Sequence, residues 1–187
     1  MQNTTPKTYD YPQFTEEMRR DYTILVPNML PVQLGLICRL MRNYGYKMEL
    51  LHTEGPNIAE QGLRNVHNDT CYPALLVIGQ FIEALKSGRY DTHKVALMMF
   101  QTGGGCRASN YLFLIKKALQ KNGFDYVPVI SLNFSGLKNE GDGWELTLPM
   151  IRCGIAAVSY GDLLMLLSNQ TRPYEKNKGE SDRLVEK

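Results

Sequence analysis

The stretch HKVALMMFQTGGGCRASNYLFLIKKALQKNG, residues 93–123, decides the fold of this chain. Its first part, HKVALMMF, is almost wholly apolar, which is typical of a central strand that is buried on both faces. The glycine-rich QTGGGCRASN follows, and YLFLIKKALQKNG predicts a helix that ends at Gly123. A buried strand that leads through a tight loop into a helix is the building unit of parallel α/β proteins.

Further strands and helices extend this unit on both sides. TILVP (residues 23–27), KMELL (47–51) and YVPVISLNF (126–134) are short β-rich runs that predict strands. Apolar residues at helical spacing in PVQLGLICRLMRNYGY predict a helix, as does the run from about Tyr72 to Lys86, where Pro73 suits the first turn. We therefore expect an α/β fold with an open, mainly parallel sheet of about four strands and helices on both faces, Rossmann-like and doubly wound.

The remaining segments predict one domain with two short extensions. Residues 1–20 are polar and predict an N-terminal tether, residues 21–175 the α/β domain, and residues 176–187 a charged, flexible tail. Residues 144–175 are mostly helical by pattern, and we expect this helix to be broken near Gly154 and Gly161.

Composition excludes several classes of partner. The chain has 187 residues with a formal net charge of +2, so its charge gives no indication that it binds nucleic acid. The N-terminal MQNTTPKTYDYPQF lacks the apolar core of a signal peptide, and we expect no apolar stretch long enough to cross a bilayer. A cytoplasmic protein is the expectation, in which the four cysteines are reduced.

The loop between the central strand and its helix has the clearest chemical signal. Gly103, Gly104 and Gly105 allow backbone N–H groups to approach a ligand, and a helix N-terminus favours negative charge. Cys106 is expected to have thiolate character there, with Arg107 adding positive charge. The loop lacks the P-loop lysine and does not fit G-x-G-x-x-G, so a phosphate, a thiolate or an anionic cluster remain open, beside a simple tight turn.

A second cysteine, Cys71, also lies just before a predicted helix, in HNDTCYPALLVIGQ. No C-x-x-C spacing is present, so ligands would have to come from separate loops of the sheet edge. Cys38 and Cys153 lie in apolar patterns and are expected to pack as small hydrophobic side chains. His67 is expected to structure its loop, and Asp69 to act as a cap or an Asx-turn residue ahead of the helix that follows.

Several of these motifs together resemble the 2-hydroxyacyl-CoA dehydratase superfamily and its activases, in the region after the ATPase modules of activase-related proteins. The motifs are YTILVPNMLP, HNDTCYPALLVIGQ, QTGGGCRASNYLFLIKKAL, VPVISLNFSG and YGDLLMLLSNQTRPYE, which span most of residues 14–175. The resemblance implies Rossmann-like domains and an oxygen-sensitive [4Fe-4S] cluster held by cysteines from loops of two domains. It maps Cys71 and Cys106 onto the first two cluster ligands.

The same resemblance implies partners for this chain. A third ligand would come from a second dehydratase-like domain, and ATPase activase modules would supply a low-potential electron. We expect a partial chain, which by itself does not hydrolyse ATP, with an acyl-CoA as a possible substrate. Two other hypotheses stay open: a phosphate or CoA site at Gly103–Gly105 and Arg107 without a cluster, and an interaction piece whose bare docking face is covered in a homodimer.

Overall fold

The computed structural model describes residues 11–52, 55–67, 69–101, 111–133 and 143–186. Its centre is a sheet of four strands: β1 (Thr23–Val26), β2 (Met48–Leu50), β3 (Val95–Gln101) and β4 (Val129–Asn133). The strand order is β2-β1-β3-β4, and every neighbouring pair is parallel. The predicted fold class, an open parallel α/β sheet of about four strands, is confirmed.

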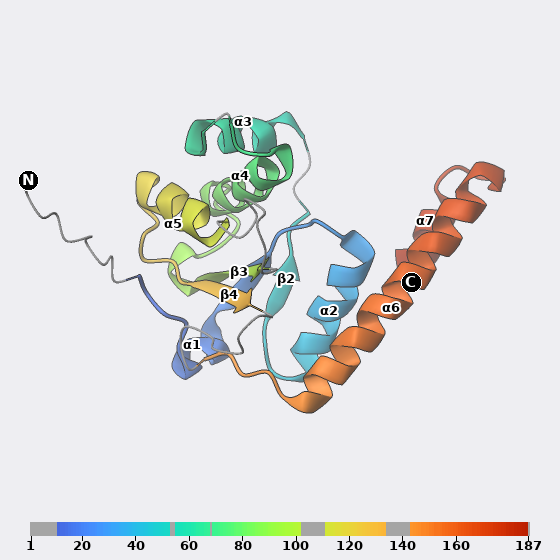
Figure 1. The fold of residues 1–187 in the computed structure, drawn as a ribbon, viewed down its shortest axis with the longest axis horizontal. Helices are drawn as coiled ribbons and strands as arrows, with labels where there is room; N and C mark the ends of the chain where they lie inside the picture. The colour runs from blue at the N-terminus through green and yellow to red at the C-terminus, as the bar shows by residue number, and fades with distance from the viewer. Residues whose placement is uncertain (1–10, 53–54, 68, 102–110, 134–142, 187) are drawn as a thin grey trace, which may run out of the picture.

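Both faces of the sheet are buried, because successive side chains of a strand point to opposite sides. On one face Leu25 and Leu97 pack in a core with helices α4 (Tyr72–Lys86) and α5 (Tyr111–Lys121). On the other face Ile24 and Met98 pack with α2 (Pro31–Asn43). Figure 1 shows these two helical layers on either side of the strands.

The other described helices are α1 (Glu16–Asp21), α3 (Pro56–Asn65), α6 (Leu148–Thr171) and α7 (Glu180–Glu186), with short 3-10 turns at Thr92–Lys94 and Arg172–Tyr174. Local sequence explains where they begin. Proline occupies the first turn of α2, α3, α4 and α6, where its missing N–H costs nothing. The hydroxyls of Thr15 and Thr147 accept hydrogen bonds from first-turn N–H groups and so cap α1 and α6.

The central strand is shifted from its predicted bounds. The sequence predicted a strand over residues 93–100, whereas β3 begins at Val95 and ends at Gln101. The carboxylate of Asp91 accepts a hydrogen bond from the His93 N–H at 3.1 Å, and this cap turns His93 and Lys94 into a 3-10 helix. The local hydrogen bond therefore overrides the β-rich pattern at these two positions.

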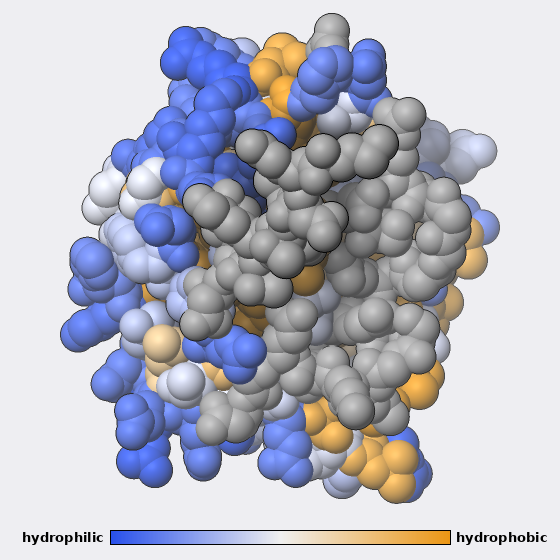
Figure 2. All heavy atoms as spheres, turned by 60° about the vertical axis from the view of Figure 1, so that its left-hand side comes forward, coloured by the Kyte–Doolittle hydropathy of each residue, from blue (hydrophilic) through white to orange (hydrophobic). Residues whose placement is uncertain are grey.

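Packed structure extends beyond the predicted domain limits at both ends. Within the predicted tether of residues 1–20, Phe14 is buried in the α2-side core and α1 follows it. Within the predicted flexible tail of residues 176–187, α7 packs against α6. Figure 2 shows the side of the molecule nearer the N-terminus, where hydrophilic residues cover much of the described surface.

Helix α6 corrects the expectation of breaks near Gly154 and Gly161, because it is continuous over 24 residues. It runs along the outer side of α2, as Figure 1 shows. A Cβ on Gly161 would lie 2.9 Å from Cγ of Gln33 on α2, so this glycine permits the close helix crossing. Gln33 also donates a hydrogen bond from Nε2 to Oδ1 of Asp162 at 2.7 Å. Gly161 is therefore a packing position and not a helix breaker.

The continuity of α6 also overturns the expectation that no apolar stretch reaches the length of a bilayer. Leu148–Tyr174 is long and apolar enough to cross a membrane by length and composition. Only 11% of its most apolar stretch is buried inside the molecule. Most of this apolar helix is therefore exposed along its length.

Candidate functional site

The carboxyl ends of β1 and β3 form the natural ligand edge of this sheet. The chain leaves β1 toward α2 and β2, and it leaves β3 toward α5 and β4, so the two connections diverge between adjacent strands. In open α/β sheets ligands bind in the crevice that such a switch point creates. The predicted loop with Gly103, Gly104, Gly105, Cys106 and Arg107 follows β3 directly, and its residues lie outside the described part of the chain.

Cys71 lies next to the helix that follows this loop. Its Sγ is 3.8 Å from Oη of Tyr111, the first residue of α5, which is itself buried. Tyr111 comes one residue after the segment that contains Cys106. The thiol of Cys71 therefore contacts the side chain of the first residue of α5, although the two residues are 40 positions apart in the sequence.

Cys71 is the N-cap residue of α4, and its side chain makes no capping hydrogen bond. The sequence predicted Asp69 as a cap or an Asx-turn residue ahead of this helix, and of these two roles the N-cap position belongs to Cys71 instead. The first-turn N–H groups of a helix have no intrahelical acceptor, and Pro73 removes one of these donors, which leaves those of Tyr72 and Ala74 at the start of α4. Cys71 is exposed. An exposed sulfur is accessible to a metal ion or to an electrophile, so Cys71 could act as a ligand or a nucleophile.

His67 pairs with Asp69 in the loop before α4. Its Nδ1 lies 3.1 Å from Oδ2 of Asp69, and the Asp69 N–H lies 3.3 Å from the same nitrogen. The carbonyl of His67 accepts a hydrogen bond from the N–H of Thr70 at 3.0 Å. These local contacts fit the predicted loop-structuring role of His67.

A pair of amide groups, missed in the sequence, ties the end of β1 to α4. The N–H of Asn28 donates to Oε1 of Gln80 at 2.7 Å, and Nε2 of Gln80 donates back to the carbonyl of Asn28 at 3.3 Å. Gln80 is buried within the apolar helix α4. A single glutamine in an otherwise apolar helical run is the signal that could have predicted such a contact.

The two other described cysteines differ from each other. Cys38 is buried in the α2-side core, which confirms its predicted packing, and burial raises the pKa of its thiol to about 11. Cys153 is exposed, so its prediction as a core side chain is wrong. The pKa of the half-buried Tyr44 is raised, mainly by burial and to a smaller extent by a hydrogen bond with Cys153.

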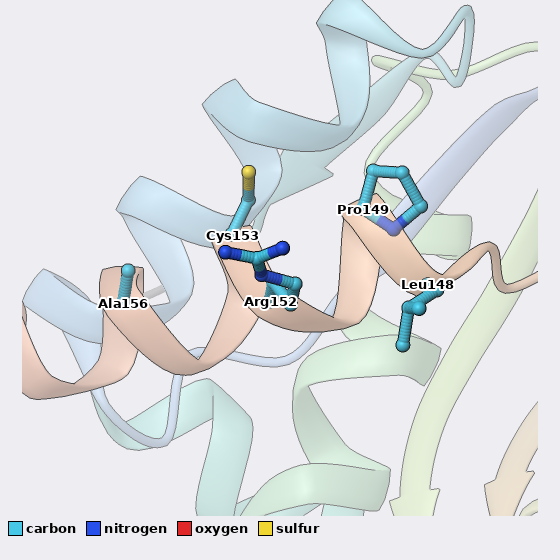
Figure 3. Close-up of a pocket in the computed structure, with 5 residues that line it drawn as sticks. All are labelled: Leu148, Pro149, Arg152, Cys153 and Ala156. Carbon is cyan, nitrogen blue, oxygen red and sulfur yellow. The ribbon is translucent and has the colours of Figure 1, made fainter.

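Cys153 lines an open groove of about 390 Å³ on α6, shown in Figure 3 with Leu148, Pro149, Arg152 and Ala156. Cys153 points toward α2 in this view, whereas Leu148 projects away from it. The helix α6 packs on the α2 face of the sheet, and α4, which carries Cys71, packs on the opposite face. The exposed thiols of Cys71 and Cys153 therefore belong to different sides of the sheet.

An apolar cavity of about 290 Å³ lies between α2, α6 and strands β2 and β3. Four methionines contribute to its wall: Met41, Met48, Met98 and Met150. Phe100 also lines it and stands two residues before Thr102, where the glycine-rich loop begins. None of the described residues that line the cavity is acidic, basic or a cysteine, so these residues can enclose an apolar group but supply no acid, base or nucleophile. The nine methionines of the sequence were the signal for such an adaptable wall.

Among the residues that the structure describes, no three His, Cys, Asp or Glu side chains come together as a metal site. Comparison with known proteins adds no relative, since no family model, no curated protein and no solved structure matches this chain. The fold defines the chain as an open parallel α/β protein. Its particular chemistry has to be argued from the cysteines at the edge of the sheet.

Proposed function

We propose that the carboxyl edge of the sheet is a cysteine-ligated site for a [4Fe-4S]-type cluster, in a system like the 2-hydroxyacyl-CoA dehydratases and their activases. Cys71 and Cys106 would be the ligands that this chain supplies. The observation that carries the proposal is the 3.8 Å contact between Sγ of Cys71 and Oη of Tyr111, at the start of the helix that follows Cys106.

The surroundings of Cys71 suit a negatively charged cluster. Iron–sulfur clusters are held by cysteine thiolates, and N–H groups near the sulfurs stabilise the net negative charge. The exposed thiol of Cys71 stands at the start of α4, where free N–H groups gather. The glycines at 103–105 would offer more N–H groups near Cys106, at the start of α5.

The fit of the described residues to a cluster is partial. A [4Fe-4S] cluster usually takes four cysteines, and Cys71 with Cys106 supplies two. Cys38 is buried in the core and Cys153 lies on the other side of the sheet, so neither completes the site. Further ligands would come from a second domain or chain. A bound cluster would supply one-electron chemistry and an iron able to polarise a carbonyl or hydroxyl oxygen.

The test is iron and acid-labile sulfide content after anaerobic cluster reconstitution. We expect iron and sulfide in the native chain and their loss in Cys71→Ala and in Cys106→Ala. Cys153→Ala is the matched control, since it removes an exposed thiol on the other side of the sheet, and Cys38→Ala removes a buried one. Equal metal content in all four variants would mean adventitious binding, and no metal in the native chain would refute the proposal for this chain.

A second candidate function is binding of an acyl-CoA-type ligand without a cluster. The apolar cavity beside Phe100 favours it, because an acyl group could enter there while the glycines and Arg107 hold phosphate. In a titration with an acyl-CoA, this function predicts binding that survives Cys106→Ala and is weakened by Arg107→Ala. Binding that is unaffected by Arg107→Ala would count against it.

A further inference from the structure

Helix α6 presents an apolar face that nothing in the described structure covers. Its side chains Leu148, Ile155 and Leu166 are 70%, 64% and 53% exposed. Of its 24 residues only Arg152 and Asp162 are charged. A contiguous exposed apolar patch of this kind marks an interaction surface.

Helical geometry places this face on the side of α6 opposite its buried residues. The residues of α6 that are buried are Met150, Gly161 and Ser168, and Gly161 packs on Gln33 of α2. At 3.6 residues per turn, Leu148, Ile155, Ser159 and Leu166 form a stripe on the opposite side. All four are exposed, and Ile155 and Ser159 also border the apolar cavity beside α2. Figure 3 shows Leu148 projecting away from α2.

The two charges of α6 flank this stripe symmetrically. Arg152 comes five residues before Ala157, and Asp162 comes five residues after it. Both side chains are exposed, although Oδ1 of Asp162 also accepts the hydrogen bond from Gln33. Consider two copies of this helix packed antiparallel with their Ala157 residues at the same height. Asp162 of each copy would then lie opposite Arg152 of the other, which gives two opposite-charge pairs.

We infer that this face of α6 is a homodimer interface, in which a second copy of the chain packs antiparallel about a two-fold axis level with Ala157. Leu148 then meets Leu166, Ile155 meets Ser159, and two Arg152–Asp162 pairs fix the register. Such an interface is isologous, since each copy uses the same surface. The inference is independent of the proposed cluster, which lies on the other side of the sheet.

A membrane fits the same face less well. Asp162 stands in the middle of the helix, where a carboxylate would be costly in hydrocarbon. Gln33 and Gly161 also fix α6 to α2, and a spanning helix would have to leave this contact. A helix that lies on a membrane surface usually carries several Lys or Arg side chains on its polar face, and α6 has only Arg152.

The experiment measures the mass of the full chain by sedimentation up to about 100 µM, in the native form and in two charge reversals. Each of Arg152→Glu and Asp162→Lys alone brings like charges together, so we expect dimerisation about tenfold weaker or more. An equimolar mixture of the two variants restores both opposite-charge pairs, so we expect it to form a heterodimer of near-native affinity. Lys178→Glu, which reverses an exposed charge outside α6, is the control and should dimerise like the native chain.

Three outcomes would overturn the inference. The first is a native chain that stays monomeric over the whole concentration range. The second is a mixture no more dimeric than its components, with both variants shown to be folded by circular dichroism. The third is a native monomer that binds anionic phospholipid vesicles in co-sedimentation, which would assign the face to a membrane instead.

Discussion

Two glycines of α6 have the same helical backbone but different neighbours, and substitution should separate them. A Cβ at Gly161 would lie 2.9 Å from Cγ and 3.1 Å from Cα of Gln33, whereas a Cβ at Gly154 meets no atom within 4 Å. We expect Gly161→Ala to lower the free energy of unfolding by about 1–3 kcal/mol through overpacking. Gly154→Ala should raise it by up to about 1 kcal/mol through helix propensity. Urea denaturation measures both, and a stabilising Gly161→Ala would contradict the close crossing.

The buried thiol of Cys38 should make stability depend on alkaline pH. Its pKa is raised from the ordinary value of 9.0 to about 11, so between these values the unfolded chain loses a proton that the folded chain keeps. The contribution of the Cys38 thiol to the free energy of unfolding is therefore fully present below pH 9 and is lost as the pH rises toward 11. We expect native and Cys38→Ala chains to differ in the pH slope of the free energy of unfolding over this range. Because burial and its Glu49 hydrogen bond raise the pKa of Tyr90 to about 12, only the difference between the two chains tests Cys38.

The same thiol should resist alkylation. At pH 8 we expect iodoacetamide to modify Cys71 and Cys153, which are exposed, and to leave Cys38 unmodified in the folded chain. Peptide mass spectrometry gives the extent at each site. Modification of Cys38 as fast as of Cys153 would show that the α2-side core opens readily.

At the scale of elements, the packing of α3 on α4 depends on two glycines. A Cβ at Gly79 would lie 2.0 Å from the carbonyl oxygen of Ile58, and a Cβ at Gly62 would lie 2.3 Å from that of Leu75. Since both obstacles are backbone atoms, one helix would have to move away. We expect Gly79→Ala to cost about 3 kcal/mol of unfolding free energy. Gly35→Ala in α2, where a Cβ meets no atom within 4 Å, is the control and should be neutral or stabilising.

The elements that were predicted well are those with a strong local pattern. The apolar run in HKVALMMF predicted a central strand, and Pro73 indicated where α4 begins. The breaks expected in α6 were wrong because a glycine that ends a helix and one that admits a neighbouring helix are alike in sequence. Only the position of Gln33 on α2, far away in the chain, distinguishes them.

Of the candidate site, the position of Cys71 was predictable from the sequence, but its contacts were not. Local sequence placed Cys71 at the start of a helix, and the structure agrees. Its contact with Tyr111 and the apolar cavity beside Phe100 join segments distant in the chain, so no local pattern indicates them. Cys153 was misjudged for a related reason, since an apolar helix is taken as buried until its neighbours are known.

At the scale of the whole molecule, low net charge and the exposed helix should act together on solubility. The sequence has a pI of about 8.3 and a formal net charge of +2 at pH 7. Charge repulsion is weakest near the pI, so we expect the solubility minimum there, measured by light scattering between pH 6 and pH 10. Leu166→Glu removes part of the exposed apolar face, so the variant should be more soluble than the native chain at this minimum. A native chain equally soluble at every pH would contradict this expectation.

The sheet separates the surface around Cys71 from the exposed apolar face of α6. Cys71 belongs to the helical layer of α4 and α5, and α6 belongs to the layer beyond α2. A molecule that occupies one surface would leave the other accessible, with four strands between them. With both proposed surfaces occupied, the domain would act as a spacer that keeps two binding partners a fixed distance apart, and each surface could then change in evolution without disturbing its counterpart.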